Sequence, residues 1–217
     1  MLRLHDHRTG RAEEVARGPL RVHVAAGADR ALIVADLLRR VAERTGRRPV
    51  VVTRAEGVEP SAYGFSDLNL PDFPVAPAPA SDTAVFVGPA PGPGLSVVVP
   101  DAAPAGDDPL CLRLGVLRVR YREPADLAAA AERARDDLSR WRGLMAEWAR
   151  SPGRPMDPTY AARGQDALAD DLNSPAALAT LDRLAEDPDV APGAKLETFI
   201  HLDLLLGLDL VSQIGSA

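Results

Sequence analysis

The stretch LRVHVAAGADRALIVADLLRRVAERTGRRPVVVTR, residues 20–54, decides the fold. Its first five residues alternate between apolar and polar side chains, which is typical of a β-strand. Over residues 29–45 apolar side chains recur at intervals of three and four, and this predicts a helix that Asp29 caps and Gly46 ends. Residues 49–53 are apolar and β-branched, as in buried parallel strands. A strand, a helix and a strand in this order predict a βαβ unit.

Residues 60–109 differ from this pattern because they are rich in proline. Proline has no backbone N–H and clashes with the preceding helical turn, so no regular helix is expected there. Two short strands are predicted at residues 84–87 and 95–99. The stretch 71–81 has the composition of an extended linker or a covering loop.

The remainder of the chain has the periodicity of helices. We expect five of them, over residues 110–119, 125–150, 160–171, 175–186 and 195–208. The predicted fold class is therefore α/β plus all-α. A reduced Rossmann-like (HUP-type) parallel sheet occupies residues 1–109, and a helical bundle occupies residues 110–217.

Composition excludes several classes of protein. Hydrophobic residues make up 46% of the chain and charged residues 26%, with a net charge of −6, as in ordinary globular proteins. No apolar run reaches the ~18 residues of a membrane span, and residues 1–11 lack the apolar core of a signal peptide. We therefore expect a cytoplasmic protein with no membrane partner. The single cysteine, Cys111, excludes an intrachain disulfide and a zinc site with two or more thiolates.

The turn between the first predicted parallel strand and its helix is one candidate site. It consists of Ala26, Gly27, Ala28, Asp29 and Arg30. Backbone N–H groups at a helix N-terminus can bind an anion. The turn contains neither G-x-G-x-x-G nor a P-loop, so it indicates nucleotide or anion binding weakly. A phosphate-binding lysine would have to be Lys195, the one lysine of the chain.

A group of arginines is the second candidate site. Arg118, Arg120 and Arg122 alternate, as if on one face of a strand, and Arg133 and Arg140 follow on the long predicted helix. With aromatic residues nearby, they could contact RNA or a protein partner. Acidic residues are interleaved among them, so a solvated face paired within the chain is the other interpretation.

The remaining polar candidates have ordinary structural interpretations. His5 and His7 are either a surface metal pair or exposed turn residues. His23 is expected within a strand, and His201 in a helical pair with Glu197. The acidic turn at residues 170–173 is expected to cap the helix that follows it.

Four segments together resemble class I cysteinyl-tRNA synthetases. Residues 20–54 resemble the first Rossmann βαβ of that family, and the other three are LRLHDHRTGRAEEV (2–15), LCLRLGVLRVRYREPADLAAA (110–130) and ALADDLNSPAALATLDRLAED (167–187). The cysteine ligase of mycothiol biosynthesis shares this ancestry. The resemblance implies a Rossmann-like domain followed by helices that lie near the tRNA acceptor end.

The departures from the family pattern affect its catalytic motifs. The HIGH and KMSKS motifs have no counterpart, and the family's turn cysteine, a zinc ligand, falls at about Ala25. The other zinc ligands are not matched, and the proline-rich segment stands where the family has a large insertion. In that family the lost groups stabilise charge on the ATP phosphates, and losing one such donor typically lowers a rate by about 10² to 10³.

The resemblance and its gaps together predict a noncatalytic synthetase-like pseudoenzyme that acts by binding. A protein partner or self-association, a remnant nucleotide pocket and tRNA are its candidate ligands. We expect no required cofactor and no zinc, with residual ATP or adenylate binding as a possibility. The alternative is a repurposed small-molecule or aminoacyl-transfer enzyme that uses the remnant Rossmann pocket.

Overall fold

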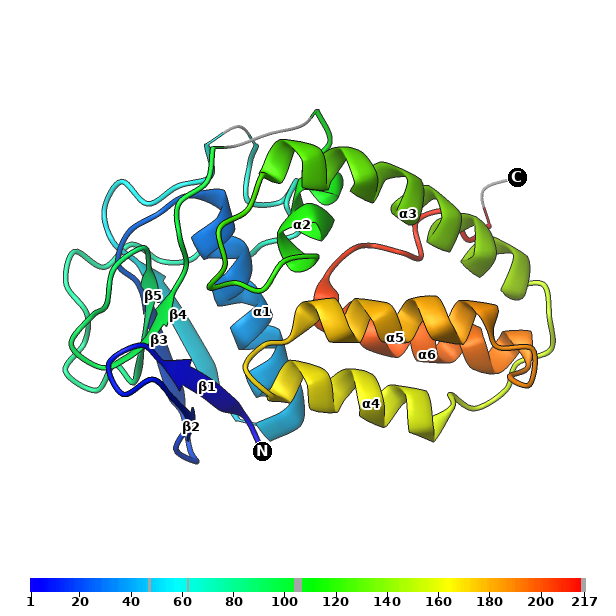
Figure 1. Cartoon of the computed structure of the whole chain (residues 1–217), viewed down its shortest axis with the longest axis horizontal. Coiled ribbons are helices and arrows are strands. Elements are labelled where there is room, and N and C mark those ends of the chain that lie inside the picture. Colours follow the sequence, from blue (N-terminus) through cyan, green and yellow to red (C-terminus); the bar gives the residue numbers. More distant parts are fainter. Residues whose placement is uncertain (47, 62, 104–106, 216–217) are drawn as a thin grey trace.

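The computed structural model describes residues 1–46, 48–61, 63–103 and 107–215. The chain begins with an antiparallel hairpin and continues as a parallel sheet with one helix between its first two strands (Figure 1). Helices then follow to the C-terminal region. The elements are β1 (Arg3–Asp6), β2 (Arg11–Glu14), β3 (Leu20–Val24), α1 (Asp29–Gly46), β4 (Val50–Arg54), β5 (Val85–Gly88), β6 (Leu95–Val98), α2 (Pro109–Leu117), α3 (Leu127–Trp148), α4 (Pro158–Ala169), α5 (Ser174–Glu186) and α6 (Pro192–Leu206).

The parallel sheet has the strand order β4-β3-β5-β6. Val22 of β3 lies opposite Val52 on one side and Val85 on the other, so three buried valines share one layer. The chain passes from β3 to β4 and then returns across β3 to β5, which is the strand reversal of a Rossmann-like sheet. The predicted fold class, a reduced Rossmann-like sheet followed by helices, is confirmed.

One face of the sheet is covered by α1, which lies between the sheet and helices α4 to α6 (Figure 1). Irregular segments, rather than helices, lie on the other side of the sheet. Parallel sheets are usually covered by helices on both faces. Here the thinner cover leaves Val51 of β4 42% exposed.

The return from β5 to β6 is short for a parallel connection. It runs tightly over the ring of Phe86. A Cβ on Gly92 or Gly94 would lie 2.7 or 2.8 Å from atoms of that ring. Glycine at these two positions therefore lets the backbone cross the sheet without a covering helix.

The helices α2 to α5 begin at a polar cap, and α6 begins with proline in its first turn. Asp108, Asp126 and Asp157 cap α2, α3 and α4 through side-chain oxygens. Asn173 caps α5 by accepting from the Ala176 N–H, which confirms the capping role predicted for that turn. Among the described residues, one continuous hydrophobic core joins sheet and helices. The division at residue 109 stays a prediction.

Two local expectations are wrong. The arginines at 118, 120 and 122 do not share the face of a strand, because α2 ends at Leu117 and a turn follows. Asp29 does not cap α1 either. The Ala28 carbonyl accepts the first helical hydrogen bond, from the Leu32 N–H, and the Asp29 side chain bonds elsewhere.

Candidate functional site

A pocket of about 310 Å³ lies at the carboxyl ends of β3 and β6. In a Rossmann-like sheet this edge, beside the strand reversal, is the usual place for a ligand. Residues 27–31, at the N-terminus of α1, form one wall and residues 99–102 form the other. Gly27 has a φ of +99°, and a Cβ there would lie 2.8 Å from Ala31. The turn therefore requires glycine at this position.

The Asp29 carboxylate ties this turn to the proline-rich segment. It accepts a hydrogen bond from the Ser61 N–H at 3.0 Å and another from the Ser61 hydroxyl. Asp29 is only 3% exposed. Its charge therefore sits beside the helix N-terminus, and it holds the loop after β4 in place.

The Arg30 guanidinium is also used within the chain. Arg30 is 3% exposed and donates to the backbone carbonyls of Pro100, Arg120 and Glu123. Burial lowers the pKa of Arg30. The side chain thus joins the end of β6 to the loop between α2 and α3. The sequence offers no other cation in this turn.

A second carboxylate completes the pocket. Asp101 Oδ1 lies 3.6 Å from the position that a Cβ on Gly27 would take. The carboxylates of Asp29 and Asp101 and the hydrogen-bonded guanidinium of Arg30 therefore surround the backbone N–H groups that we predicted as an anion site. The described lining residues include no histidine, cysteine or lysine. Gly27, Ala28, Asp29 and Arg30 line this pocket, and Ala26 is not among its lining residues. Anion binding by this turn stays a prediction, and the two carboxylates are unfavourable for phosphate.

Four of the five arginines proposed for RNA contact are ion-paired within the chain. Arg118 pairs with Asp137 and Asp182, and Arg140 also pairs with Asp182, at 2.6 Å. Arg120 and Arg122 both reach Asp171. Arg133 makes no ion pair with any residue that the structure describes. The contact with RNA or a partner stays a prediction for this group.

Trp141, which lies beside Arg118 and Arg140, belongs to the core. Trp141 is fully buried, and its indole N–H donates to Asp182 at 3.2 Å. The guanidinium groups of Arg118 and Arg140 lie 5.3 and 5.7 Å from its ring centre. This arrangement fastens α3 to α5 through cation–π contacts and ion pairs. It leaves no exposed ring at this position on which a base could stack.

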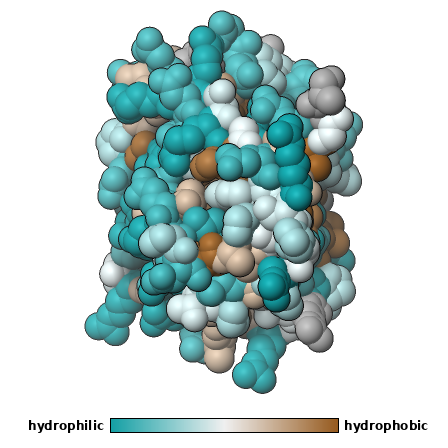
Figure 2. Space-filling model, turned by 90° about the vertical axis from the view of Figure 1, so that its right-hand side faces the viewer, coloured by the Kyte–Doolittle hydropathy of each residue, from teal (hydrophilic) through white to brown (hydrophobic). Residues whose placement is uncertain are grey.

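The single lysine lies far from the α1 turn along the chain and in space. Lys195 donates to the Ala185 carbonyl at 2.8 Å, and its ammonium lies 5.7 Å from the ring centre of Trp148. The start of α6 is at the end of the bundle remote from the sheet (Figure 1). That end presents a mainly hydrophilic surface, with apolar atoms in small separate groups (Figure 2). Lys195 therefore stabilises the bundle and is not a group of the pocket.

The histidines are also distributed over the molecule. His23 Nδ1 lies 3.0 Å from the Thr53 hydroxyl within the sheet, and His201 Nε2 lies 2.8 Å from the Gln165 side chain. Burial lowers the pKa of both imidazoles. His5 and His7 line a separate pocket beside β6. Cys111 is buried on α2, as expected for a small hydrophobic residue.

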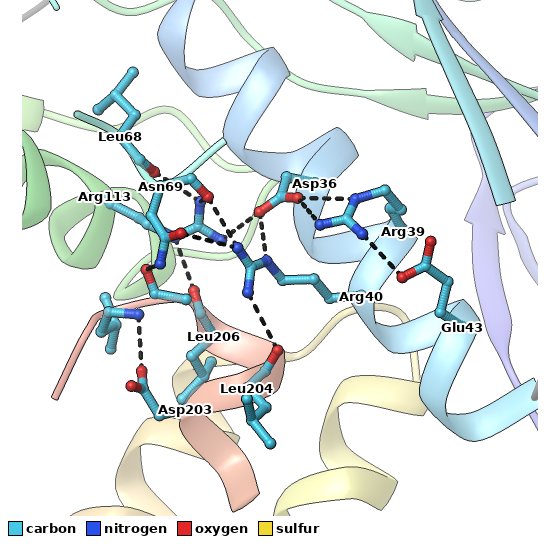
Figure 3. A network of polar contacts seen from close by, with 12 residues as sticks. Asp36, Arg39, Arg40, Glu43, Leu68, Asn69, Arg113, Asp203, Leu204 and Leu206 are labelled. Atoms are coloured by element: carbon cyan, nitrogen blue, oxygen red, sulfur yellow. Dashed lines mark hydrogen bonds and ion pairs between the residues drawn. The ribbon is translucent and has the colours of Figure 1, made fainter. Parts of the chain in front are cut away.

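Sequence reasoning missed a buried ionic network between α1, α2 and α6 (Figure 3). Asp36 and Arg113 form an ion pair at 2.7 Å in which both side chains are fully buried. Arg39 and Arg40 also contact Asp36. Arg113 further donates to the Leu206 carbonyl at 2.8 Å, which ties the end of α6 to the network. The sequence did carry a signal for this network, because Asp36 and Arg113 are charged residues that each lie within an apolar stretch of a predicted helix.

The described residues contain no group of three or more histidine, cysteine, aspartate or glutamate residues that could hold a metal ion. In the same part of the chain, no helix is long and apolar enough to cross a membrane. These findings concern the described residues and leave the expected absence of zinc a prediction.

Comparison with known proteins places the chain beside one kind of ligase. No family model matches it. It is 35% identical over 118 residues to the L-cysteine:1D-myo-inositol 2-amino-2-deoxy-alpha-D-glucopyranoside ligase of Acidothermus cellulolyticus, 54% of this chain and 28% of the ligase. Half of this chain is homologous to these cysteine ligases. The ligase of Streptomyces griseus is 38% identical over 117 residues, 48% of this chain and 26% of its own. That of Thermobifida fusca is 37% identical over 130 residues, 54% of this chain and 29% of its own.

The homology confirms the resemblance found in the sequence, since the cysteine ligases belong with the class I synthetase-like proteins. The chain spans between a quarter and a third of the length of these ligases. The fold agrees, because a Rossmann-like sheet precedes helices in the order that the resemblance implied.

Proposed function

We propose that this chain is a noncatalytic relative of the cysteine ligases that acts by binding. The proposal rests chiefly on Arg30. It is the one cation of the α1 turn, and it is buried and bonded to three backbone carbonyls. Stabilising a phosphoryl group in a transition state requires donors aimed at the developing charge. A guanidinium that holds two loops together does not supply such a donor.

The charges around the turn support the same proposal. Asp29 and Asp101 bring two carboxylates to the N-terminus of α1, where an ATP phosphate would otherwise be stabilised. The one lysine and the four histidines lie outside this pocket. The chain thus keeps the architecture of a ligand site at the sheet edge, while its side chains serve to hold the fold.

The first test is a ligation assay on the purified chain. L-cysteine, ATP and 1D-myo-inositol 2-amino-2-deoxy-alpha-D-glucopyranoside are supplied together, and the amide product is measured by mass spectrometry. The Thermobifida fusca ligase serves as the positive control. We expect no product above the protein-free reaction. Product that forms with the chain and disappears in the Asp101→Lys variant would overturn the proposal, and the repurposed-enzyme alternative would then stand.

The second test asks what the pocket binds. A nonhydrolysable cysteinyl-adenylate analogue is titrated by calorimetry, with ATP alone as the comparison. Saturable micromolar binding that Asp101→Lys alters, and that exposed Asp82→Lys does not, would assign the binding role to the remnant pocket. The absence of heat would direct the search to protein partners and to tRNA. Affinity for tRNA would then have to fall steeply with added salt.

A further inference from the structure

A second pocket lies beside the free edge of the sheet, at β6. Its volume is about 320 Å³. Three segments distant in sequence form it, namely the β1–β2 hairpin, β6 with the residues after it, and the loop between α2 and α3. The lining residues are His5, His7, Ser96, Val98, Pro100, Tyr121 and Arg122. Pro100 also lines the pocket at the α1 turn, so the two pockets are neighbours.

Three of the polar side chains that line this pocket, those of His5, His7 and Arg122, do not use all their hydrogen-bond donors within the described part of the chain. His5 is half-buried and His7 is exposed. Neither imidazole is hydrogen-bonded to any residue in the described part of the chain. Arg122 uses one terminal nitrogen, which donates to Asp171 at 2.9 Å. Its other N–H groups make no further hydrogen bond within the same described ranges, and its side chain remains 38% exposed.

The carboxylates nearby are already satisfied. Asp171 is 5% exposed and accepts from the Tyr121 hydroxyl at 2.6 Å and from the His5 N–H at 2.8 Å, besides its arginine partners. Asp6 is fully buried and is paired with Arg8 at 3.0 Å. Neither Asp6 nor Asp171 is among the residues that line the pocket. The His5 and His7 rings and the second terminal nitrogen of Arg122 therefore keep hydrogen-bond donors that these two carboxylates do not take up.

This arrangement suits an anion better than a metal ion. The Arg122 guanidinium repels a cation, whereas its planar fork with free N–H groups matches the oxygens of phosphate and carboxylate. Each imidazole can add one N–H donor beside it. Val98, Pro100 and the Tyr121 ring give the pocket an apolar side. An oxyanion attached to a small apolar or ring-shaped group would contact both sides at once.

We propose that this pocket binds the oxyanion group of a small molecule, a phosphate or a carboxylate, through His5, His7 and Arg122. The proposal stands whether or not the chain ligates, because none of these three residues lines the pocket at the α1 turn.

The test is a titration of the whole protein with ¹³C-labelled histidine, followed by NMR at fixed pH. Inorganic phosphate is the first probe and acetate the second. We expect the ring signals of His5 and His7, assigned with the His5→Gln and His7→Gln variants, to shift and saturate. His23 and His201 are internal controls, because their rings are bonded to Thr53 and Gln165. Saturation with phosphate points to a phosphorylated ligand, and saturation with acetate alone points to a carboxylate.

Two arginine variants make the test specific. Arg122→Gln removes the proposed donor, and we expect it to weaken binding by about tenfold or more, as for a hydrogen bond to a charged group. Arg120→Gln is the matched control, because Arg120 also pairs with Asp171 but does not line the pocket. It should leave the affinity within about twofold. Equal weakening by both variants, equal shifts at all four histidines, or no saturable shift would overturn the proposal.

Discussion

The buried pair of Asp36 and Arg113 carries the largest single-residue effect that we expect on stability. Replacing Asp36 by Asn leaves the Arg113 guanidinium buried without its partner, and such a loss typically costs about 3–5 kcal/mol. Urea unfolding should therefore show a loss of that size for Asp36→Asn. The double variant with Arg113→Met should lose less. Asp170→Asn, which breaks the exposed pair with Arg3, should cost about 1 kcal/mol at most. Equal losses for Asp36→Asn and Asp170→Asn would contradict this assignment.

The same carboxylate should make stability depend on acidity. Burial opposes the charged form of Asp36, but the guanidinium groups of Arg113, Arg40 and Arg39 outweigh it and hold its pKa below the usual value. The unfolded chain then takes up a proton at a higher pH than the folded chain does. The contribution is complete above about pH 4 and is lost as the pH falls through the folded pKa. Urea midpoints measured against pH should fall more steeply below pH 4 for the natural chain than for Asp36→Asn.

Single residues were the level at which the sequence was least informative. Arg30 was expected to face a ligand, because its position follows a strand and opens a helix. Its actual partners are the carbonyls of Pro100, Arg120 and Glu123, all more than sixty residues away. The alternating arginines 118–122 likewise form ion pairs with Asp171, Asp137 and Asp182, and they do not belong to a strand. Ion pairs between residues far apart in the chain produce no periodic pattern in the local sequence, so they could not be predicted from it.

At the scale of elements, adding one methyl group to the glycine that ends α6 should lower the stability of the protein. Gly207 has a φ of +69°, and a Cβ there would lie 2.7 Å from the Arg113 guanidinium. Gly207→Ala should therefore lower the free energy of unfolding by at least about 1 kcal/mol, since it strains the backbone and displaces a buried cation. Gly143 provides the control. It lies exposed within α3 with no atom near its missing Cβ, and Gly143→Ala should stabilise by about 0.5–1 kcal/mol. Thermal unfolding of both variants tests the opposite signs.

Regular elements were predicted well wherever apolar periodicity was strong. The strands at β3 and β4 and the helix α1 lie within a residue or two of their expected places. The strand β2 was missed because Arg11–Glu14 has no large apolar side chain and is held by pairing with β1. Proline content predicted that residues 60–109 would form no regular helix, and it left open whether residues 71–81 are a linker or a covering loop. The tight path over Phe86 depends on contacts that composition does not reveal.

At the scale of the whole molecule, the sheet and the helices should unfold together. The helix α1 contacts α2, α4 and α6 as well as three strands, and the network around Asp36 joins it to α2 and the end of α6. Separate domains divided at residue 109 would lose their structure at different urea concentrations. Hydrogen exchange followed by mass spectrometry in rising urea should instead show the amides of β3 and α5 exposed in one transition. Asp36→Asn should separate the two, because it weakens the contact that couples them. Two transitions in the natural chain would show that the bundle is an independent unit and that this network does not join it to the sheet.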